Sequence, residues 1–359
     1  MRSTSTALLA TRGKRAVMGA AVVALAASIA ACSSSGGDSS GSAAASGAAA
    51  GKNLTNVTIA TPGPSSAFGF LWVAQDEGIF AKFGLNVKIE TVSNSAQVPG
   101  LVKNSFQFIP QAGTAERAAL QGQGVVNVLS ALTNATSALV VRPGISSVAD
   151  LKGKTIATAS AISTPTLLAK AYLAKNGLSN SVKLLSLQSE QAQETAFTSG
   201  QADGLFLNLD TVVIAQGKVP GSKILVTPQD MGVAPGAQAG LATSKSFLES
   251  NPDTVKAMIG ASLEATKFSL ANPDQTIAIY AKEFGTTKAE ATVIYNGIKP
   301  YIVLRATPKD SELQANAASD SKSLGKTLTV ADVKNAAWNT SLAEEEFKAL
   351  DCPDVCAQG

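Results

Sequence analysis

Few residue types in this chain could carry covalent or metal chemistry, and their numbers exclude several kinds of site. The 359 residues include three cysteines and no histidine. A serine–histidine–aspartate triad, a cysteine–histidine pair and a zinc site with imidazole ligands all need histidine, so the sequence excludes them. Three cysteines are also too few for a four-cysteine metal site. We therefore expect no enzyme activity, catalytic residue, metal or cofactor, and instead a protein that binds and releases.

The first cysteine lies at the end of an export signal. Basic residues between Arg12 and Arg15 precede an apolar run that ends at Ala31, which is shorter than the roughly 20 residues of a transmembrane helix. The run closes in Ile29-Ala30-Ala31-Cys32, which resembles the bacterial lipobox, in which the cysteine is lipidated; the alternative is an ordinary signal peptide with a chance cysteine. We predict a signal peptide over residues 1–31 and a lipid anchor at Cys32, on the outer face of the cell membrane.

A polar, low-complexity segment follows this cysteine. Residues 33–52 are almost entirely serine, glycine and alanine, which cannot bury enough surface to fold. We predict a flexible linker over residues 32–53. The signal contains four of the 29 basic residues and no acid, so the rest of the chain has 25 basic and 26 acidic residues. With this balance, we expect no nucleic-acid partner.

The other two cysteines, Cys352 and Cys356, stand near the C-terminus. A close pair outside the cytoplasm favours a disulfide that fixes the tail. A redox site is the alternative, although the spacing has three intervening residues rather than two.

The body alternates between strand and helix patterns. We predict strands over residues 56–60, 86–91, 105–109, 125–132, 138–142, 155–158, 182–187, 204–208 and 237–243. Helices are predicted between them over residues 68–77, 96–103, 114–121, 164–175 and 190–199. Asn251-Pro252 and Asn272-Pro273 each indicate a helix start in a helical tail. The fold class is therefore α/β, with two βαβ series and parallel strands.

Three segments of the body carry a family resemblance. They read FLWVAQDEGIFAKFGLNVKIE at residues 70–90, DLKGKTIA at 150–157 and GQADG at 200–204. In this order and spacing they resemble the solute-binding proteins of ABC importers, in the branch for sulfonates, taurine, nitrate and thiamine-pyrimidine precursors. The resemblance covers about residues 54–300.

This resemblance implies a type II periplasmic-binding fold, with two lobes joined by a two-strand hinge. Lobe 1 would comprise residues 54–136 plus 242–359, and lobe 2 residues 137–241. The implied function is capture of a small organic solute in the cleft and its delivery to an ABC permease with its ATPase. We expect a monomer.

Ligands of open α/β sheets bind beyond the carboxyl ends of the strands. The residues at those positions are mostly small hydroxyl and amide types, with almost no arginine or lysine. In the first series the candidate ligand-binding residues are Ser65, Ser66, Phe68, Ser93, Asn94, Gln111, Gly113 and Thr114. Where the chain first crosses from lobe 1 to lobe 2, the candidates are Thr133 and Asn134. In the second series they are Ser160, Ser163, Thr164, Asn208 and Asp210.

Each candidate also has a plain structural interpretation. Serine, threonine and asparagine at helix starts more often cap the helix than bind a ligand. Phe68 and Trp72 lie on one helix face, so they pack in a core unless one of them stacks on a ligand. Asp210 caps a helix over residues 211–216 or pairs with a cationic ligand group. Glu116 and Arg117 are expected to form a solvated pair.

The ligand's charge remains open at this stage. Helix N-termini and hydroxyls suffice for a sulfonate or nitrate, and they also suit a neutral or zwitterionic molecule. We place a sulfonate or taurine-like solute first and a pyrimidine, thiamine-precursor or other vitamin-like ligand second. A ligand-sensing lipoprotein is an alternative role. An enzyme of pyrimidine biosynthesis is disfavoured, because relatives of that kind use a histidine that this chain lacks.

Overall fold

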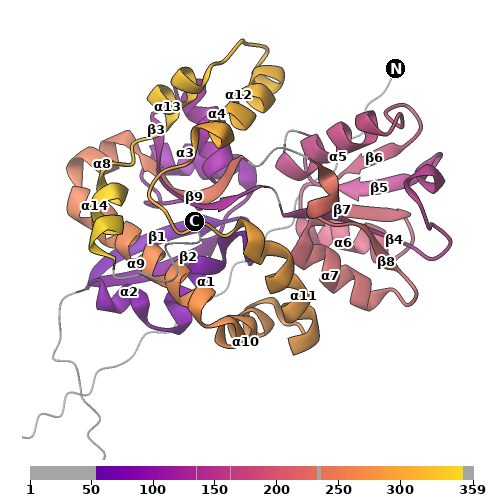
Figure 1. Cartoon of the computed structure of the whole chain (residues 1–359), viewed down its shortest axis with the longest axis horizontal. Helices are drawn as coiled ribbons and strands as arrows, with labels where there is room; N and C mark the ends of the chain where they lie inside the picture. Colours follow the sequence, from indigo (N-terminus) through magenta and orange to yellow (C-terminus); the bar gives the residue numbers. More distant parts are fainter. Residues whose placement is uncertain (1–53, 135, 162, 233–235, 351–359) are drawn as a thin grey trace, which may run out of the picture. The chain divides into compact units, whose positions relative to one another are not determined.

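The computed structural model describes residues 54–350 except 135, 162 and 233–235. The predicted signal peptide, the linker with Cys32, and Cys352 with Cys356 lie outside the described residues. Figure 1 shows the chain coloured along its sequence. Across the described residues, no helix combines the length and the hydrophobicity that crossing a bilayer requires.

The first lobe is built on two short strand pairs. β1 (Thr55–Thr61) runs parallel to β2 (Leu85–Thr91), and β3 (Val125–Thr133) runs antiparallel to β9 (Ala237–Ser244). Single bridges at Phe108 and Ile109 join the two pairs. The helices of this lobe's first half are η1 (Ser66–Phe68), α1 (Gly69–Asp76), α2 (Ile79–Lys82), α3 (Asn94–Val102) and α4 (Ala112–Leu120).

The second lobe has one five-stranded sheet in the order β6-β5-β7-β4-β8. Its strands are β4 (Ser137–Val141), β5 (Thr155–Thr158), β6 (Lys183–Ser186), β7 (Gly204–Asn208) and β8 (Lys223–Val226). Its helical segments are η2 (Val148–Leu151), α5 (Thr164–Lys175), α6 (Glu190–Thr198), α7 (Leu209–Lys218) and η3 (Gln229–Met231). β5 pairs in parallel with β6 and β7, whereas β4 runs antiparallel to β7 and β8.

The chain ends in a series of helices. They are α8 (Lys245–Ser250), α9 (Pro252–Ala271), α10 (Pro273–Phe284), α11 (Lys288–Ile298), η4 (Lys299–Tyr301), α12 (Asp310–Leu324), α13 (Val330–Ala337) and α14 (Ser341–Ala349). Local chemistry sets several starts. Asn251 and Asn272 precede the prolines that open α9 and α10, as predicted. Thr287 and Glu290 form a capping box at α11.

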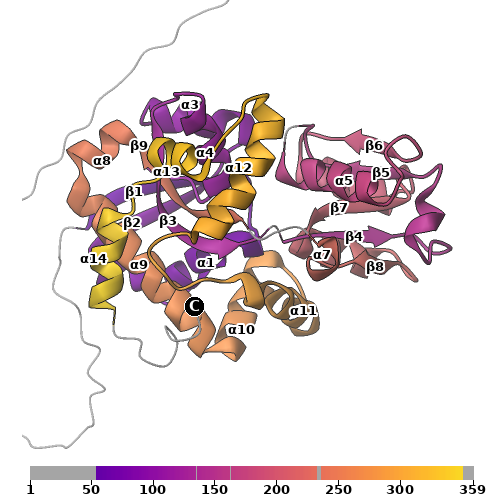
Figure 2. The same ribbon diagram turned by 45° about the horizontal axis from the view of Figure 1, so that its top comes forward.

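The tail helices do not all pack on the first lobe. α9 and α14 pack against α1 and β3, in one apolar cluster with Leu71 and Leu129. α10 also contacts α1, but α10 and α11 contribute Tyr280 and Tyr295 to a buried cluster that includes Val212 of α7 in the second lobe. Figures 1 and 2 both show α11 beside α7. The helical tail therefore buries apolar surface against both sheets.

Four details differ from the sequence-based expectations. Residues 105–109 form only isolated bridges and no named strand. β8, a four-residue edge strand that pairs only with β4, was not predicted. The antiparallel pairings of β4 with β7 and β8, and of β9 with β3, depart from the predicted parallel strands. The predicted lobe boundary at residue 241 falls inside β9, which pairs along its length with β3 of the first lobe.

Gly240 allows β9 to approach β3 closely. A Cβ atom at this position would lie 1.9 Å from the backbone oxygen of Leu129 and 2.8 Å from its carbonyl carbon. The Gly240 amide donates to the carbonyl of Pro110 at 3.0 Å. This hydrogen bond ties β9 to Pro110, two residues before α4 begins at Ala112.

Candidate functional site

One group of predicted residues meets between the two lobes. Ser66 Oγ donates to Asp210 Oδ1 at 2.7 Å, and Ser65 Oγ donates to the same oxygen at 3.3 Å. Asn208 Nδ2 lies 3.5 Å from Ser65 Oγ. The serines follow β1 and the other two residues end β7 or begin α7, so these hydrogen bonds join the two strand ends across the lobes.

The interpretation of Asp210 as the cap of α7 is wrong. The helix begins at Leu209 with Asn208 at the cap position, which places Asp210 in the first turn. The Asp210 carboxylate is buried, and this burial raises its pKa, while the hydrogen bonds from Ser66 and Ser65 oppose the rise. The carboxylate thus contacts the first lobe instead of its own helix alone.

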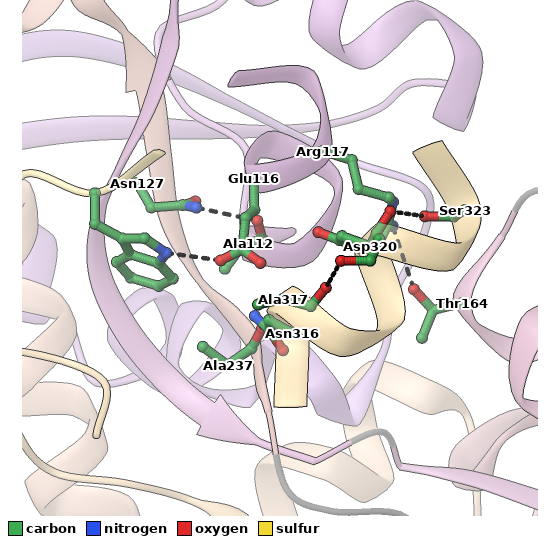
Figure 3. A network of polar contacts seen from close by, with 12 residues as sticks. Ala112, Glu116, Arg117, Asn127, Thr164, Ala237, Asn316, Ala317, Asp320 and Ser323 are labelled. Atoms are coloured by element: carbon green, nitrogen blue, oxygen red, sulfur yellow. Dashed lines mark hydrogen bonds and ion pairs between the residues drawn. The ribbon is translucent and has the colours of Figure 1, made fainter. Parts of the chain in front are cut away.

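Arg117 brings a positive charge to the interlobe region. Its Nη2 lies 3.4 Å from Thr164 Oγ1 at the start of α5, and its Nη1 lies 3.6 Å from Asp320 Oδ1 of α12. Figure 3 shows the guanidinium between these two partners. The expectation of a solvated pair with Glu116 is wrong, because Arg117 is only partly exposed and its partners come from two other elements.

Glu116 points into the protein and is fully buried. Its Oε2 accepts a hydrogen bond of 2.7 Å from the indole Nε1 of Trp338, whereas its Oε1 has no hydrogen-bond partner among the described residues. Burial raises the pKa of Glu116, and the nearby Asp320 carboxylate adds to the rise. Glu116 is therefore harder to ionise than an exposed glutamate.

The remaining first-lobe candidates surround the start of α4. Gln111 precedes the helix and donates through Nε2 to Asn94 Oδ1 at 3.0 Å. Gly113 and Thr114 lie in its first turn, and a Cβ at Gly113 would stand 3.6 Å from both Arg117 Nη1 and Gln238 Oε1. Gln238 on β9 was not among the candidates, since nothing in the sequence links it to α4.

The other candidates of this lobe lie at the start of α3 or in the core. Ser93 and Asn94 are exposed at the start of α3, where Asn94 accepts the hydrogen bond from Gln111. Phe68 is buried in the apolar cluster of the first lobe, and Trp72 packs there too, with its indole donating to the Ser65 carbonyl at 3.0 Å. Both aromatic side chains thus follow the core interpretation.

The last candidates make hydrogen bonds to backbone carbonyl groups. Ser163 Oγ donates to the Ser160 carbonyl at 2.8 Å just before α5. Where the chain first crosses between the lobes, Thr133 Oγ1 donates to the Tyr301 carbonyl at 3.4 Å. The backbone N–H of Asn134 donates to the Gly236 carbonyl at 2.8 Å. Asn134 adopts a φ of 67°, in the left-handed region that asparagine tolerates.

A cavity of about 200 Å³ lies beside Asp210. Its lining includes Glu190, Glu194 and Glu283 as well as Phe284. Burial and the neighbouring Asp210 raise the pKa of Glu190 to about 8. Within the part of the chain that the structure describes, no group of three or more histidine, cysteine, aspartate and glutamate side chains could hold a metal ion.

Comparisons with known proteins agree with this architecture. A family model described as NMT1/THI5 like matches residues 65–276. A binding protein of Brucella abortus (strain 2308) is 27% identical over 228 residues, which covers 60% of this chain and 68% of that protein.

Two solved structures illustrate the range of proteins with this fold. The alkanesulfonate-binding protein SsuA from Xanthomonas axonopodis pv. citri, bound to MOPS, matches with a TM-score of 0.63 at 18% identity, over 81% of this chain and 99% of that one. The desulfurization enzyme DSZB matches with a TM-score of 0.62 at 14% identity, over 82% and 99%. The predicted fold class is thus confirmed as that of periplasmic binding proteins.

Proposed function

The chain belongs to the NMT1/THI5-like family, and we propose that it acts as an extracytoplasmic solute-binding protein of an ABC importer. It captures a small organic solute between its two lobes and delivers it to a permease with its ATPase. It works as a monomer and performs no covalent chemistry. Contacts to both lobes favour the closed arrangement by the ligand's differential affinity for it.

The observation that carries this proposal is the position of Arg117. Its guanidinium belongs to α4 of the first lobe and contacts Thr164 at the start of α5 in the second. A solute bound there would touch both lobes at once. The Ser65–Ser66–Asp210 hydrogen bonds add a second link between the same lobes, at the neighbouring strand ends.

The chemistry around Arg117 favours a sulfonate or taurine-like anion as the solute. A guanidinium offers several N–H donors in a planar fork, which suits the oxygens of a sulfonate. The first turns of α4 and α5 add backbone N–H groups and the positive ends of two helix dipoles. SsuA of Xanthomonas, with MOPS bound, has the same fold. A neutral pyrimidine or vitamin-like precursor is the second candidate, supported by the amide and hydroxyl groups of Gln111, Gln238 and Thr164.

An enzyme with this fold is known in DSZB, so catalysis needs a separate argument. This chain has no histidine, and its three cysteines all lie outside the described residues, one at the start of the predicted linker and two in the tail. We propose that Cys32 carries lipid and that residues 32–53 tether the lobes to the outer face of the cell membrane. The lipobox-like residues before Cys32 support this location.

A ligand screen tests the proposed function. We expect an alkanesulfonate or taurine to raise the melting temperature of the mature protein by several degrees, because a ligand that binds only the folded state stabilises it. Small-angle scattering should show a smaller radius of gyration with the same ligand.

In cells, Cys32→Ser should move the protein from the membrane fraction to the soluble one. No stabilisation by sulfonates, pyrimidine precursors or nitrate would contradict the binding role, and a soluble wild type would contradict the anchor.

A further inference from the structure

Arg117 already has an anionic partner inside the chain. Asp320 Oδ1 of α12 lies 3.6 Å from Arg117 Nη1, and the Asp320 side chain is 4% exposed against 21% for Arg117. The carboxylate therefore approaches the guanidinium from the protein side, while the guanidinium retains an accessible side near Thr164. Figure 3 shows Arg117 lying between Asp320 and Thr164.

A second acid lies beside this pair. Glu116 is buried next to Arg117 in the sequence and close to Asp320, so two carboxyl groups lie near one guanidinium, and Asp320 is the one paired with it. Glu116 Oε1 and Asp320 Oδ2 both lack a hydrogen-bond partner among the described residues. Two buried acceptor atoms without donors favour a shared proton over two carboxylates.

The other charged groups of α12, α13, α4 and β9 form no ion pair with Asp320 or Glu116 among the described residues, and Lys322 of α12 is exposed. On α12 itself, Glu312 pairs with Arg305 and Asp310 with Lys334 of α13. Asp332 of α13 accepts hydrogen bonds from Thr329 at the start of its own helix. β9 contains no titratable residue, and α4 contributes only Glu116 and Arg117. Burial raises the pKa of Asp320, and Arg117 is the main group that opposes the rise.

We propose that Asp320 is an internal competitor for the anionic group of the solute, and that this group replaces it on Arg117 while the Asp320–Glu116 pair takes up a proton. The inference rests on the proposed function, because it concerns regulation of the same site. An arriving anion repels the Asp320 carboxylate and reduces the field of Arg117 upon it. Both effects favour protonation, so binding and proton uptake are linked.

An alkanesulfonate is a suitable probe because its own charge does not titrate near neutral pH. Titration calorimetry with 1-butanesulfonate should give a dissociation constant that rises by about tenfold or more between about pH 5.5 and about pH 8.5. The binding enthalpy should differ between two buffers of different ionisation enthalpy, such as imidazole and Bis-Tris. The size of this difference should correspond to the uptake of up to about one proton per sulfonate bound. Sulfonate buffers are excluded because they would compete for the site.

Three variants locate the proton. Asp320→Asn keeps the shape but removes the charge, so it should bind more tightly at neutral pH and lose most of the pH dependence. Glu116→Gln imitates the protonated acid and should remove the part of the pH dependence that Glu116 contributes. Asp310→Asn, an exposed position on the same helix, is the matched control and should keep the wild-type curve.

The outcomes separate this inference from the proposed function. If sulfonate binds with the same affinity at every pH and without proton uptake, the inference is overturned and the binding role stands. If Asp320→Asn keeps the wild-type slope, Asp320 is not the competitor. If neither the wild type nor Asp320→Asn binds any sulfonate at any pH, an anionic solute is refuted and the inference with it.

Discussion

Replacing Arg117 by alanine is expected to weaken alkanesulfonate binding by about 100-fold. A charge-assisted hydrogen bond contributes about 1.5–3 kcal/mol, which corresponds to roughly 10- to 150-fold in the dissociation constant. Arg117→Ala also leaves Asp320 without its guanidinium, so the empty site becomes more negative and repels the anion further. Titration calorimetry of wild type and variant at one pH and salt concentration gives the ratio directly.

Two controls make this result specific. Arg117→Lys retains a positive charge but loses the planar fork, and we expect an intermediate affinity. Lys154→Ala removes a half-exposed cation on the second lobe that pairs with Asp203 at 3.9 Å, and we expect the wild-type affinity. Circular dichroism should confirm that each variant is folded. Wild-type affinity in Arg117→Ala would show that the solute binds elsewhere.

Replacing Gly240 by alanine is expected to lower the free energy of unfolding by about 3 kcal/mol or more. The new Cβ would stand 1.9 Å from the backbone oxygen of Leu129, and a backbone atom can yield only if β3 and β9 separate. Forcing extra atoms into a packed core typically costs about 1–3 kcal/mol, and a backbone clash exceeds that range. Urea denaturation followed by circular dichroism measures the loss.

Gly113→Ala is the matched control for this prediction. The added Cβ would stand 3.6 Å from its nearest neighbours, an ordinary contact distance, and the position lies inside α4. Alanine is favoured over glycine in a helix by about 0.5–1 kcal/mol, so the free energy of unfolding should stay level or rise slightly. Equal stability of Gly240→Ala and Gly113→Ala would refute the close packing of β3 on β9.

Much of the fold follows from local sequence signals. The strand runs from Thr155 and Gly204 end as predicted, and the Asn-Pro pairs mark the starts of α9 and α10. Local signals were weaker for short or isolated segments at the edges of the sheets. β8 is a four-residue strand at the edge of its sheet and was not predicted. Residues 105–109 form single bridges because the chain crosses between two strand pairs instead of joining one.

The site was only partly predictable, because its contacts join distant segments. Ser65, Ser66 and Asp210 were identified from strand ends, since that position depends on local order alone. Arg117 was assigned to a solvated helix face. Its environment depends on Asp320, and that of Glu116 depends on Trp338, which is 222 residues away. No spacing rule connects α4 to α12 or α13, so only the tertiary structure reveals why these charges are buried.

A crystal structure of the mature protein with 1-butanesulfonate tests the central claim most directly. The account predicts sulfonate oxygens within hydrogen-bonding distance of the Arg117 guanidinium and of Thr164, contacts from both lobes, and a longer separation between Arg117 and Asp320. A sulfonate bound away from Arg117, with the Arg117–Asp320 pair intact and only one lobe in contact, would contradict the claim that this chain captures an anionic solute between its lobes.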